Sequence, residues 1–518
     1  MYILPAGTNP ANLSSSFTNL LAADGITLAI TNKYGKGLGN SQKSNFAPRI
    51  GFAYQVTPKF VARGGFGIFY NGFENRGYSP NLGENYPFQF NFNFGSPNDW
   101  TPRTFPGCST AGPGGTATFE TGFSCTPLDP TLVLANGLGL RGIQFNYQTP
   151  YTMSGNFTLQ YQLTPSLSVQ AGYVTSLARH LEVFPNSNNP TALLPTGAQL
   201  TNTAGPNGGP GSGATYTPAQ GGLPFPDFGQ NNSYALTEGA SYYHGLQTTV
   251  EKRYAKGLNF LATYTWSKTR TDAVDLLNGG SNAGYRAASV PGLGIHYDYG
   301  LAPFDVRNVF HLSGGYELPF GKGKPYLAND RVASKIAGGW SVNTAVVLQG
   351  GQPITFTCPS STWAGTYNSN NCYDLLIGNP GRGLHNDSNG KLSFFSNACA
   401  TGSGNCAWSQ PASCTASPCP ISVLGGAPNQ VAGPPFKRMD FSVFRNFQLT
   451  ERFRLEFRSE FFNILNHPNF NAPNFGGNGV VAVSGSGNFT NSSFGEIGST
   501  RDAPYDPRQI QFALKLYY

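Results

Sequence analysis

Apolar and polar residues alternate with a period of two along much of the chain. In residues 156–163, for example, aromatic and aliphatic residues occupy the odd positions, and Asn, Thr or Gln occupy the even ones. Such alternation is typical of β-strands with two unlike faces. It predicts eleven strands, most of them in pairs: 45–56 with 59–70, 151–163 with 167–177, 242–254 with 258–268, 304–318 with 339–349, 437–449 with 452–463, and a last strand at 508–518.

The connections between these strands are of two kinds. Most strand pairs are joined by two or three turn residues, and the fourth pair by a longer basic connection. The pairs themselves are separated by long segments rich in Gly, Asn, Ser, Thr and Pro, at 71–150, 178–241, 269–303, 350–436 and 464–507. Short turns at one end and long loops at the other are typical of an outer-membrane barrel, with the turns periplasmic and the loops extracellular. A soluble β-sandwich or solenoid is the alternative, and loops of this length on one side disfavour it.

In a barrel, the apolar face of each strand would meet lipid and the polar face would line a hydrated lumen. We therefore expect one outward-facing set, Phe157, Leu159, Tyr173, Phe260, Tyr264, Phe453, Phe457 and Phe512. The candidate lumen-lining residues are Arg49, Arg63, Gln160, Gln170, Arg454, Glu456, Arg458 and Glu460. The alternating charges at 454–460 have two interpretations, a charged substrate track or a ladder of ion pairs that bridges strands and plug across the lumen, and we favour the ladder.

Composition narrows the class of protein further. Charged residues make up 11% of the 518 residues and aromatic residues 14%. The low charge disfavours an ordinary cytosolic enzyme, and the aromatic content disfavours disorder. The sequence contains no run of about 18 apolar residues, so it predicts no transmembrane helix. The net charge of +7 comes from scattered Lys and Arg, so we expect no nucleic-acid partner.

The eight cysteines all fall in predicted loops, at Cys108, Cys125, Cys358, Cys372, Cys399, Cys406, Cys414 and Cys419. An even number in sequence-near positions predicts disulfides formed in an oxidising compartment. Pairing is expected within the loops 71–150 and 350–436 and not between them. Zinc binding is the alternative, and the absence of a CxxC pair disfavours it.

Motifs for catalysis and for cofactor binding are not found. The glycine-bearing segments 64–67 and 321–324 do not match a phosphate-binding loop, and the six histidines lack metal-site or triad spacing. Asp272, Asp275, Asp298 and Asp305 lie in or near one loop, where solvation is favoured over cation binding. The sequence therefore predicts a protein that is not an enzyme, with no cofactor and no metal site.

The start of the chain and the strand count predict a fragment. Residues 1–10 contain no signal peptide, and eleven strands are about half of a 22-stranded barrel. We therefore expect residues 1–44 to be the remnant of an extracellular loop and residues 45–518 to be the C-terminal part of a barrel. The predicted fold class is all-β, an antiparallel outer-membrane β-barrel of which this chain is about half.

Several sequence blocks are similar to those of the Oar-like family of TonB-dependent receptors. They are NFAPRIGFAY at 45–54, EKRYAKGL at 251–258, ATYTWSK at 262–268, FDVR at 304–307, YELPFG at 316–321, EFFNILNHPNF at 460–470 and DPRQIQFALK at 506–515. The resemblance implies a barrel of about 22 strands, a plug and a TonB-interacting segment. It also implies an outer-membrane receptor or transporter of a Gram-negative-type bacterium.

From this resemblance we expect the barrel portion of a transporter for an unidentified extracellular substrate. Its partners would be outer-membrane lipid, the barrel-assembly machinery and the TonB complex, the last through an N-terminal region that this chain lacks. Phe512, Leu514, Leu516 and Tyr518 resemble the terminal signal that the assembly machinery reads. The alternatives are a surface binding or adhesion protein without transport, and an inactive truncated product.

Overall fold

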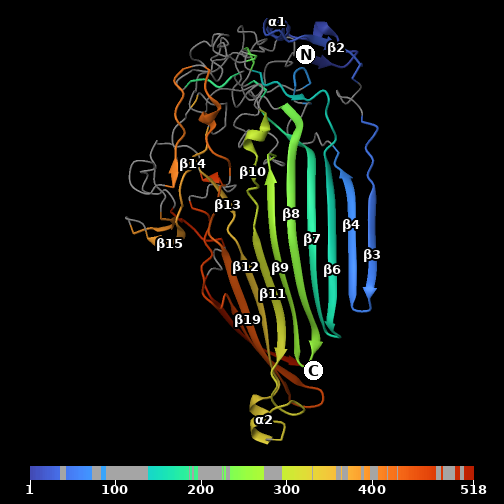
Figure 1. Cartoon of the computed structure of the whole chain (residues 1–518), viewed down its shortest axis with the longest axis vertical. Helices are drawn as coiled ribbons and strands as arrows, with labels where there is room; N and C mark the ends of the chain where they lie inside the picture. The colour runs from blue at the N-terminus through green and yellow to red at the C-terminus, as the bar shows by residue number, and fades with distance from the viewer. Residues whose placement is uncertain are drawn as a thin grey trace, which may run out of the picture.

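The computed structural model is dominated by one large twisted antiparallel sheet, and the described parts of the long connections lie toward one end of it (Figure 1). It describes residues 1–34, 42–72, 83, 85–88, 138–185, 187–188, 192–195, 224–225, 227–228, 234–273, 294–329, 331–356, 363, 372–386, 390–396, 407–416, 418–428, 430–473, 480–481, 496–501 and 507–518. No helix in this described part is long and apolar enough to cross a bilayer.

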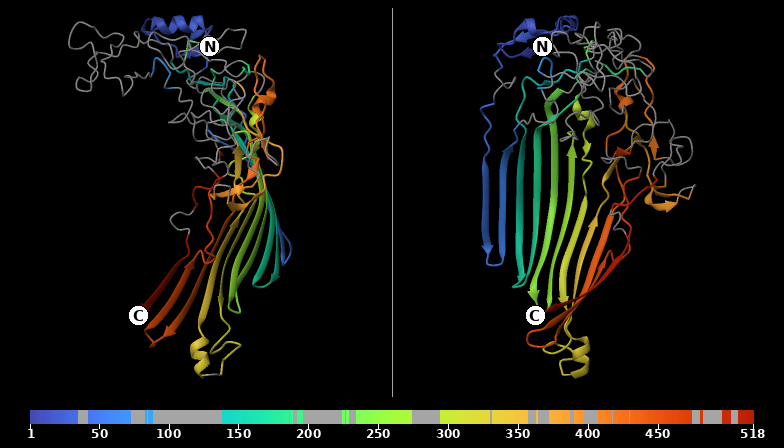
Figure 2. Two further views of the ribbon diagram at one scale, coloured as in Figure 1. Left: turned by 90° about the vertical axis from the view of Figure 1, so that its left-hand side faces the viewer. Right: turned by 180° about the vertical axis from the view of Figure 1, so that it is seen from behind.

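All eleven predicted strands are present, and each pairs with its neighbour in the chain. Their order across the sheet is β22-β20-β19-β12-β11-β9-β8-β7-β6-β4-β3, with the short strands β10 and β5 attached to β9 and β8. The bounds are β3 Arg49–Thr57, β4 Phe60–Tyr70, β5 Gly142–Ile143, β6 Tyr151–Thr164, β7 Leu167–Val183, β8 Tyr234–Ala255, β9 Leu258–Thr271, β10 Gly300–Leu301, β11 Asn308–Glu317, β12 Trp340–Gln349, β19 Phe436–Gln448, β20 Arg454–Phe462 and β22 Gln509–Tyr517. The described sheet is open, with β3 and β22 at its edges (Figure 2).

Local sequence explains the tight turns. Lys256 and Gly257 both have positive φ, 53° and 83°, as a two-residue type I′ hairpin turn requires. Pro58 and Pro165 open the turns after β3 and β6, where a fixed φ favours chain reversal. Within each of these three hairpins the two strands are therefore joined by only two residues.

Several strand boundaries differ from the sequence prediction. β7 runs on to Val183 and β8 begins at Tyr234, so both ends of the predicted loop 178–241 are strand, and β9 likewise extends to Thr271. The prediction was wrong here because these strand ends lack the contrast between an apolar and a polar face that marked the rest. In the other direction, β11 starts only at Asn308, four residues after its predicted start.

The N-terminal residues form a small folded unit, where the sequence predicted a loop remnant. β1 (Tyr2–Leu4) pairs in parallel with β2 (Leu28–Ile30), and the helix α1 (Ser15–Ala23) connects them after the 3-10 turn η1 (Pro10–Asn12). Phe17 and Leu21 of α1 are fully buried in an apolar cluster that also contains Tyr86 and Phe228 from the long connections. The unit lies at the same end of the sheet as those connections (Figure 1).

The predicted loop 350–436 likewise contains short strands with a core of their own. These are β13 (Pro353–Phe356), β14 (Leu375–Leu376), β15 (Arg382–Asn386), β16 (Leu392–Phe395), β17 (Trp408–Ser409) and β18 (Val431–Ala432), and β13 also pairs with β21 (Val480–Val481). The turn η6 (Ile421–Leu424) follows β17, and η5 (Ile295–Asp298) precedes β10. Trp408 and Phe395 are buried in this core. Between β11 and β12 the basic connection contains a second helix, α2 (Arg331–Ala337).

Candidate functional site

The register of the sheet sorts its side chains onto two chemically different faces. One row across six strands joins Phe52, Gly64, Phe157, Tyr173, Leu246 and Trp266. A row three residues further along β6 joins Gln160, Gln170, Thr249, Thr263 and His311. Because residues directly opposite each other in an antiparallel sheet share a face, the alternation within each strand becomes one apolar and one polar face.

The predicted division of these residues between two faces holds for every one of them that lies in a strand. Phe157, Leu159, Tyr173, Phe260, Tyr264, Phe457 and Phe512 share the apolar face, while Gln160, Gln170, Arg454 and Arg458 share the opposite face. Phe453 directly precedes β20. Which of the two faces encloses a lumen stays a prediction.

The apolar face presents large side chains that nothing in the described structure covers. Ile50, Phe512 and Leu514 are 74%, 68% and 68% exposed. Gly64 contributes to this surface, because a Cβ there would stand 2.7 Å from the ring of Phe52. The ring instead lies across β4 toward Phe157, with 6.4 Å between ring centroids. An apolar surface of this extent is not compatible with water on that side of the sheet.

The polar face carries the candidate lumen-lining residues in two groups. Near one edge, Arg63 on β4 donates to the side chain of Gln170 on β7, which pairs directly with Gln160. The guanidinium of Arg49 lies 4.7 Å from the ring centroid of Phe69. The strands β8 to β19 separate this group from the charged residues of β20.

The charges on β20 form a ladder along their own strand. Arg458 Nη2 lies 2.7 Å from Glu456 Oε1, and Nη1 lies 3.7 Å from Glu460 Oε1. Arg454 instead lies over the ring of Tyr517, at 4.5 Å from the centroid. Both carboxylates are paired with one guanidinium of the same strand, so the described contacts are ion pairs within β20. A ladder that bridges strands and plug stays a prediction.

A pocket of about 390 Å³ at the loop end of the sheet was not found by sequence reasoning. The N-terminal unit, residues near Asn85, and the segment 141–145 enclose it, and its rings are those of Tyr2, Tyr34, Phe88, Phe145 and Tyr234. The side chain of Asn85 donates to the carbonyl of Arg141 at 2.7 Å and accepts from its N–H at 2.8 Å. This pair of bonds holds the backbone of Arg141, the one Lys or Arg among the described residues that line the pocket. Aromatic walls with one cation suit a ring-bearing ligand with an anionic group.

Two acidic residues that the sequence placed near one loop turn out to support the backbone. Asp272 accepts from the N–H of Ala240 at 2.7 Å, and Asp305 accepts from the N–H of Thr269 at 2.6 Å. Within the described ranges no group of three or more His, Cys, Asp or Glu could hold a metal ion. Asp275 lies outside the described residues.

Asp374 is a buried acid in the separate core of segment 350–436. It is 0% exposed, and neither carboxylate oxygen has a hydrogen-bond partner. Burial raises the pKa of this carboxyl to about 8, because the charged form is poorly solvated there.

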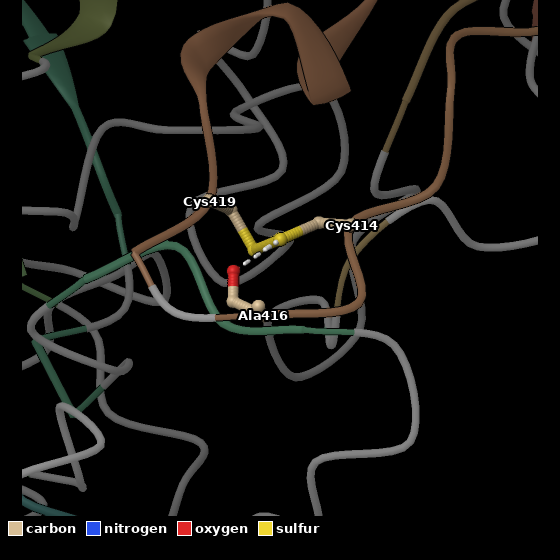
Figure 3. Close-up of a disulfide and its surroundings, with 3 residues drawn as sticks. All are labelled: Cys414, Ala416 and Cys419. Carbon is tan, nitrogen blue, oxygen red and sulfur yellow. Dashed lines mark hydrogen bonds between the residues drawn. A yellow bond between two sulfur atoms is a disulfide. The ribbon is translucent and has the colours of Figure 1, made fainter.

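Cys414 and Cys419 form a disulfide within the predicted loop 350–436 (Figure 3). The sulfur of Cys414 also lies 3.1 Å from the carbonyl oxygen of Ala416, as a contact only, since a bridged sulfur has no proton to donate. Cys372 is disulfide-bonded as well. Cys108, Cys125, Cys358, Cys399 and Cys406 lie outside the described residues, so their predicted pairing stays a prediction.

The sequence model of the outer membrane beta barrel domain family matches residues 5–511. The chain belongs to this family. Its place is accordingly the outer membrane, which explains both the exposed apolar face and the single large antiparallel sheet. The match also includes most of the N-terminal unit, which the sequence prediction had separated from the barrel at residue 45.

Known structures give weaker likenesses. The ferric-catecholate import receptor Fiu of Escherichia coli is 9% identical, with a TM-score of 0.34, over 90% of this chain and 34% of that chain. The outer membrane transporter YddB of Escherichia coli is 9% identical, with a TM-score of 0.34, over 89% of this chain and 38% of that chain. The pyoverdine receptor FpvA of Pseudomonas aeruginosa is 9% identical, with a TM-score of 0.35, over 91% of this chain and 36% of that chain. The chain thus spans little more than a third of their length, and TM-scores of this size assign no ligand. No curated protein matches the sequence.

Proposed function

We propose that this chain forms part of the membrane-spanning barrel of a TonB-dependent-type receptor. This receptor binds an unidentified extracellular substrate and moves it across the outer membrane. The observation that carries the proposal is the division of eleven strands into an apolar and a polar face. A polar face opposite lipid needs water or protein to solvate it, and the lumen of a transport barrel supplies both. The resemblance of seven sequence blocks to Oar-like receptors supports the same assignment.

The open edges support a barrel larger than the described sheet. β3 and β22 each have a single partner in the described sheet, and an unpaired strand edge in lipid leaves backbone groups unsatisfied at several kcal/mol each. We therefore infer that further strands pair with both edges, in a closed barrel of about 22 strands. The polar groups of Arg63 and Arg458 would then line one lumen.

An uptake assay tests the proposal against the alternative of surface binding alone. Cells with and without the protein, each with and without the TonB complex, would be given a panel of labelled oligosaccharides, oligopeptides and chelated metals. Transport predicts accumulation of some probe that needs both the protein and TonB. A different outcome would contradict transport: some probe binds to the cell surface only when the protein is present, but no probe enters through the protein, whether or not the TonB complex is present.

Surface binding without transport is the second candidate, and the pocket at the loop end favours it. The pocket is separate from the polar face of the strands, so it could hold a ligand without passing it on. Replacing Arg141 with Gln should weaken binding of an anionic probe in either case. Only if the protein transports its ligand should the substitution also lower TonB-dependent uptake.

A further inference from the structure

One turn at the end of the sheet opposite the long loops differs from the others there. The turns after β3, β6 and β8 contain two residues each, whereas β11 and β12 are joined by residues 318–339. This long turn contains α2 and projects beyond the strand ends (Figure 1). A transmembrane strand pair needs no such insertion, since three other pairs of the sheet reverse direction with two residues and the pair β19–β20 with five.

The helix is fastened to the apolar face of the sheet. Arg445 lies on that face of β19, directly opposite Trp340 on β12 and Phe457 on β20. Its two Nη groups donate to the carbonyl oxygens of Ile336, at 2.7 Å, and of Lys335. Trp340 Nε1 donates to the same Ile336 oxygen at 3.0 Å. The C-terminal end of α2 is thus capped by residues of the face that meets lipid, and not by the polar face.

The exposed side of α2 is amphipathic. Val332 and Ile336, one helical turn apart, are 68% and 67% exposed. Lys335 beside them is exposed, and so is Lys322 earlier in the same turn. Water would leave this apolar pair uncovered, whereas the boundary between acyl chains and head groups accommodates apolar and basic side chains together.

We propose that α2 is an interfacial anchor, which lies in the periplasmic surface of the outer membrane beside β12 and β19. Val332 and Ile336 insert among the acyl chains, and Lys335 and Lys322 contact anionic phospholipid head groups. Two features identify lipid as the occupant: the helix continues the apolar face through Trp340 and Arg445, and the exposed basic side chains described in this turn include Lys335 and Lys322. The inference rests on the proposed function for its membrane orientation.

Depth-dependent quenching tests the anchor in the full chain. An environment-sensitive fluorescent amino acid would replace Ile336, and the protein would be reconstituted in vesicles with brominated acyl chains. The same label in place of Phe512 on the apolar face reports lipid, and in place of Glu451, exposed in the turn 449–453, reports water. Quenching at 336 should exceed that at 451 by about threefold or more, and should approach that at 512, for a helix buried at the interface.

Charge is tested in the same vesicles. Adding phosphatidylglycerol to phosphatidylcholine should increase quenching at 336, and Lys335→Glu should abolish that increase. Strong quenching at 512 with quenching at 336 no greater than at 451 would overturn the anchor and leave the barrel intact. Weak quenching at both 336 and 512 would overturn the barrel proposal itself. Protection of 336 from both brominated lipid and aqueous iodide would show a protein partner or a second copy instead, which also overturns the anchor.

Discussion

Two neighbouring residues of β6, Leu159 and Gln160, offer a matched test of which face of the sheet meets lipid. Leu159 lies on the apolar face and Gln160 on the polar face. Each would be replaced by Arg, so that the same side chain enters the same strand at nearly the same height. Only the face differs between the two variants.

The structure gives the expected depth of these positions. Leu159 is five residues from Thr164, where β6 ends, or about 17 Å along a strand that rises about 3.4 Å per residue. At a tilt of about 40° this is about 13 Å along the membrane normal, which is the middle of an apolar band about 25 Å tall. Arg at the midplane of a barrel costs about 2–4 kcal/mol on the lipid face. Gln160→Arg should change the free energy of unfolding by less than about 0.5 kcal/mol, because residue 160 lies on the polar face beside Gln170.

The assay is urea unfolding of the full chain in lipid vesicles. A loss of about 3 kcal/mol at a slope of about 3 kcal/mol per molar lowers the midpoint by roughly 1 M, and Leu159→Arg should show this shift. Leu159→Met serves as the control for lost packing without charge. Equal shifts for the two Arg variants, or a larger one for Gln160→Arg, would refute the assignment of the faces.

Three further predictions concern single residues. Arg458→Leu should lower the free energy of unfolding by about 1–3 kcal/mol in the same urea assay, because Glu456 and Glu460 lose the cation that they share. An unchanged free energy of unfolding would speak against a structural role for these ion pairs. Burial raises the pKa of Asp374 to about 8, so the folded state holds a proton that the unfolded state releases. Its contribution is therefore full below about pH 4, falls with rising pH by up to about 1.4 kcal/mol per unit, and is lost above about pH 8. Asp374→Asn should remove this part of the pH dependence of protease cleavage at residues 372–376, and an unchanged profile would contradict the account. Cys414→Ser, which opens a short disulfide loop to Cys419, should cost about 2 kcal/mol locally, seen as faster cleavage near residues 414–424, whereas unchanged cleavage would exclude a stabilising role.

The sequence by itself determined the strands, their pairing and their two faces. A period of two with strong contrast between the faces, as in residues 156–163, leaves no other way to place one set of side chains in lipid and the other in water. The turn residues Lys256 and Gly257 then fix the register of a hairpin. Both are local signals, so they can be read without knowing the rest of the fold.

Other features were decided by contacts between distant segments. The N-terminal unit buries Phe17 against Tyr86 and Phe228, and the pocket of Tyr34, Phe145 and Tyr234 forms from pieces more than 80 residues apart. No periodicity marks such a site, because each piece contributes only one or two side chains. The seating of α2 on Trp340 and Arg445 is of the same kind: a strand pattern cannot show that an arginine on the apolar face is placed to bind the end of a helix more than 100 residues away. Local alternation therefore predicted the large sheet of this protein. Its loop pocket and helical turn instead follow from long-range packing, because their contacting residues come together only once the sheet has formed.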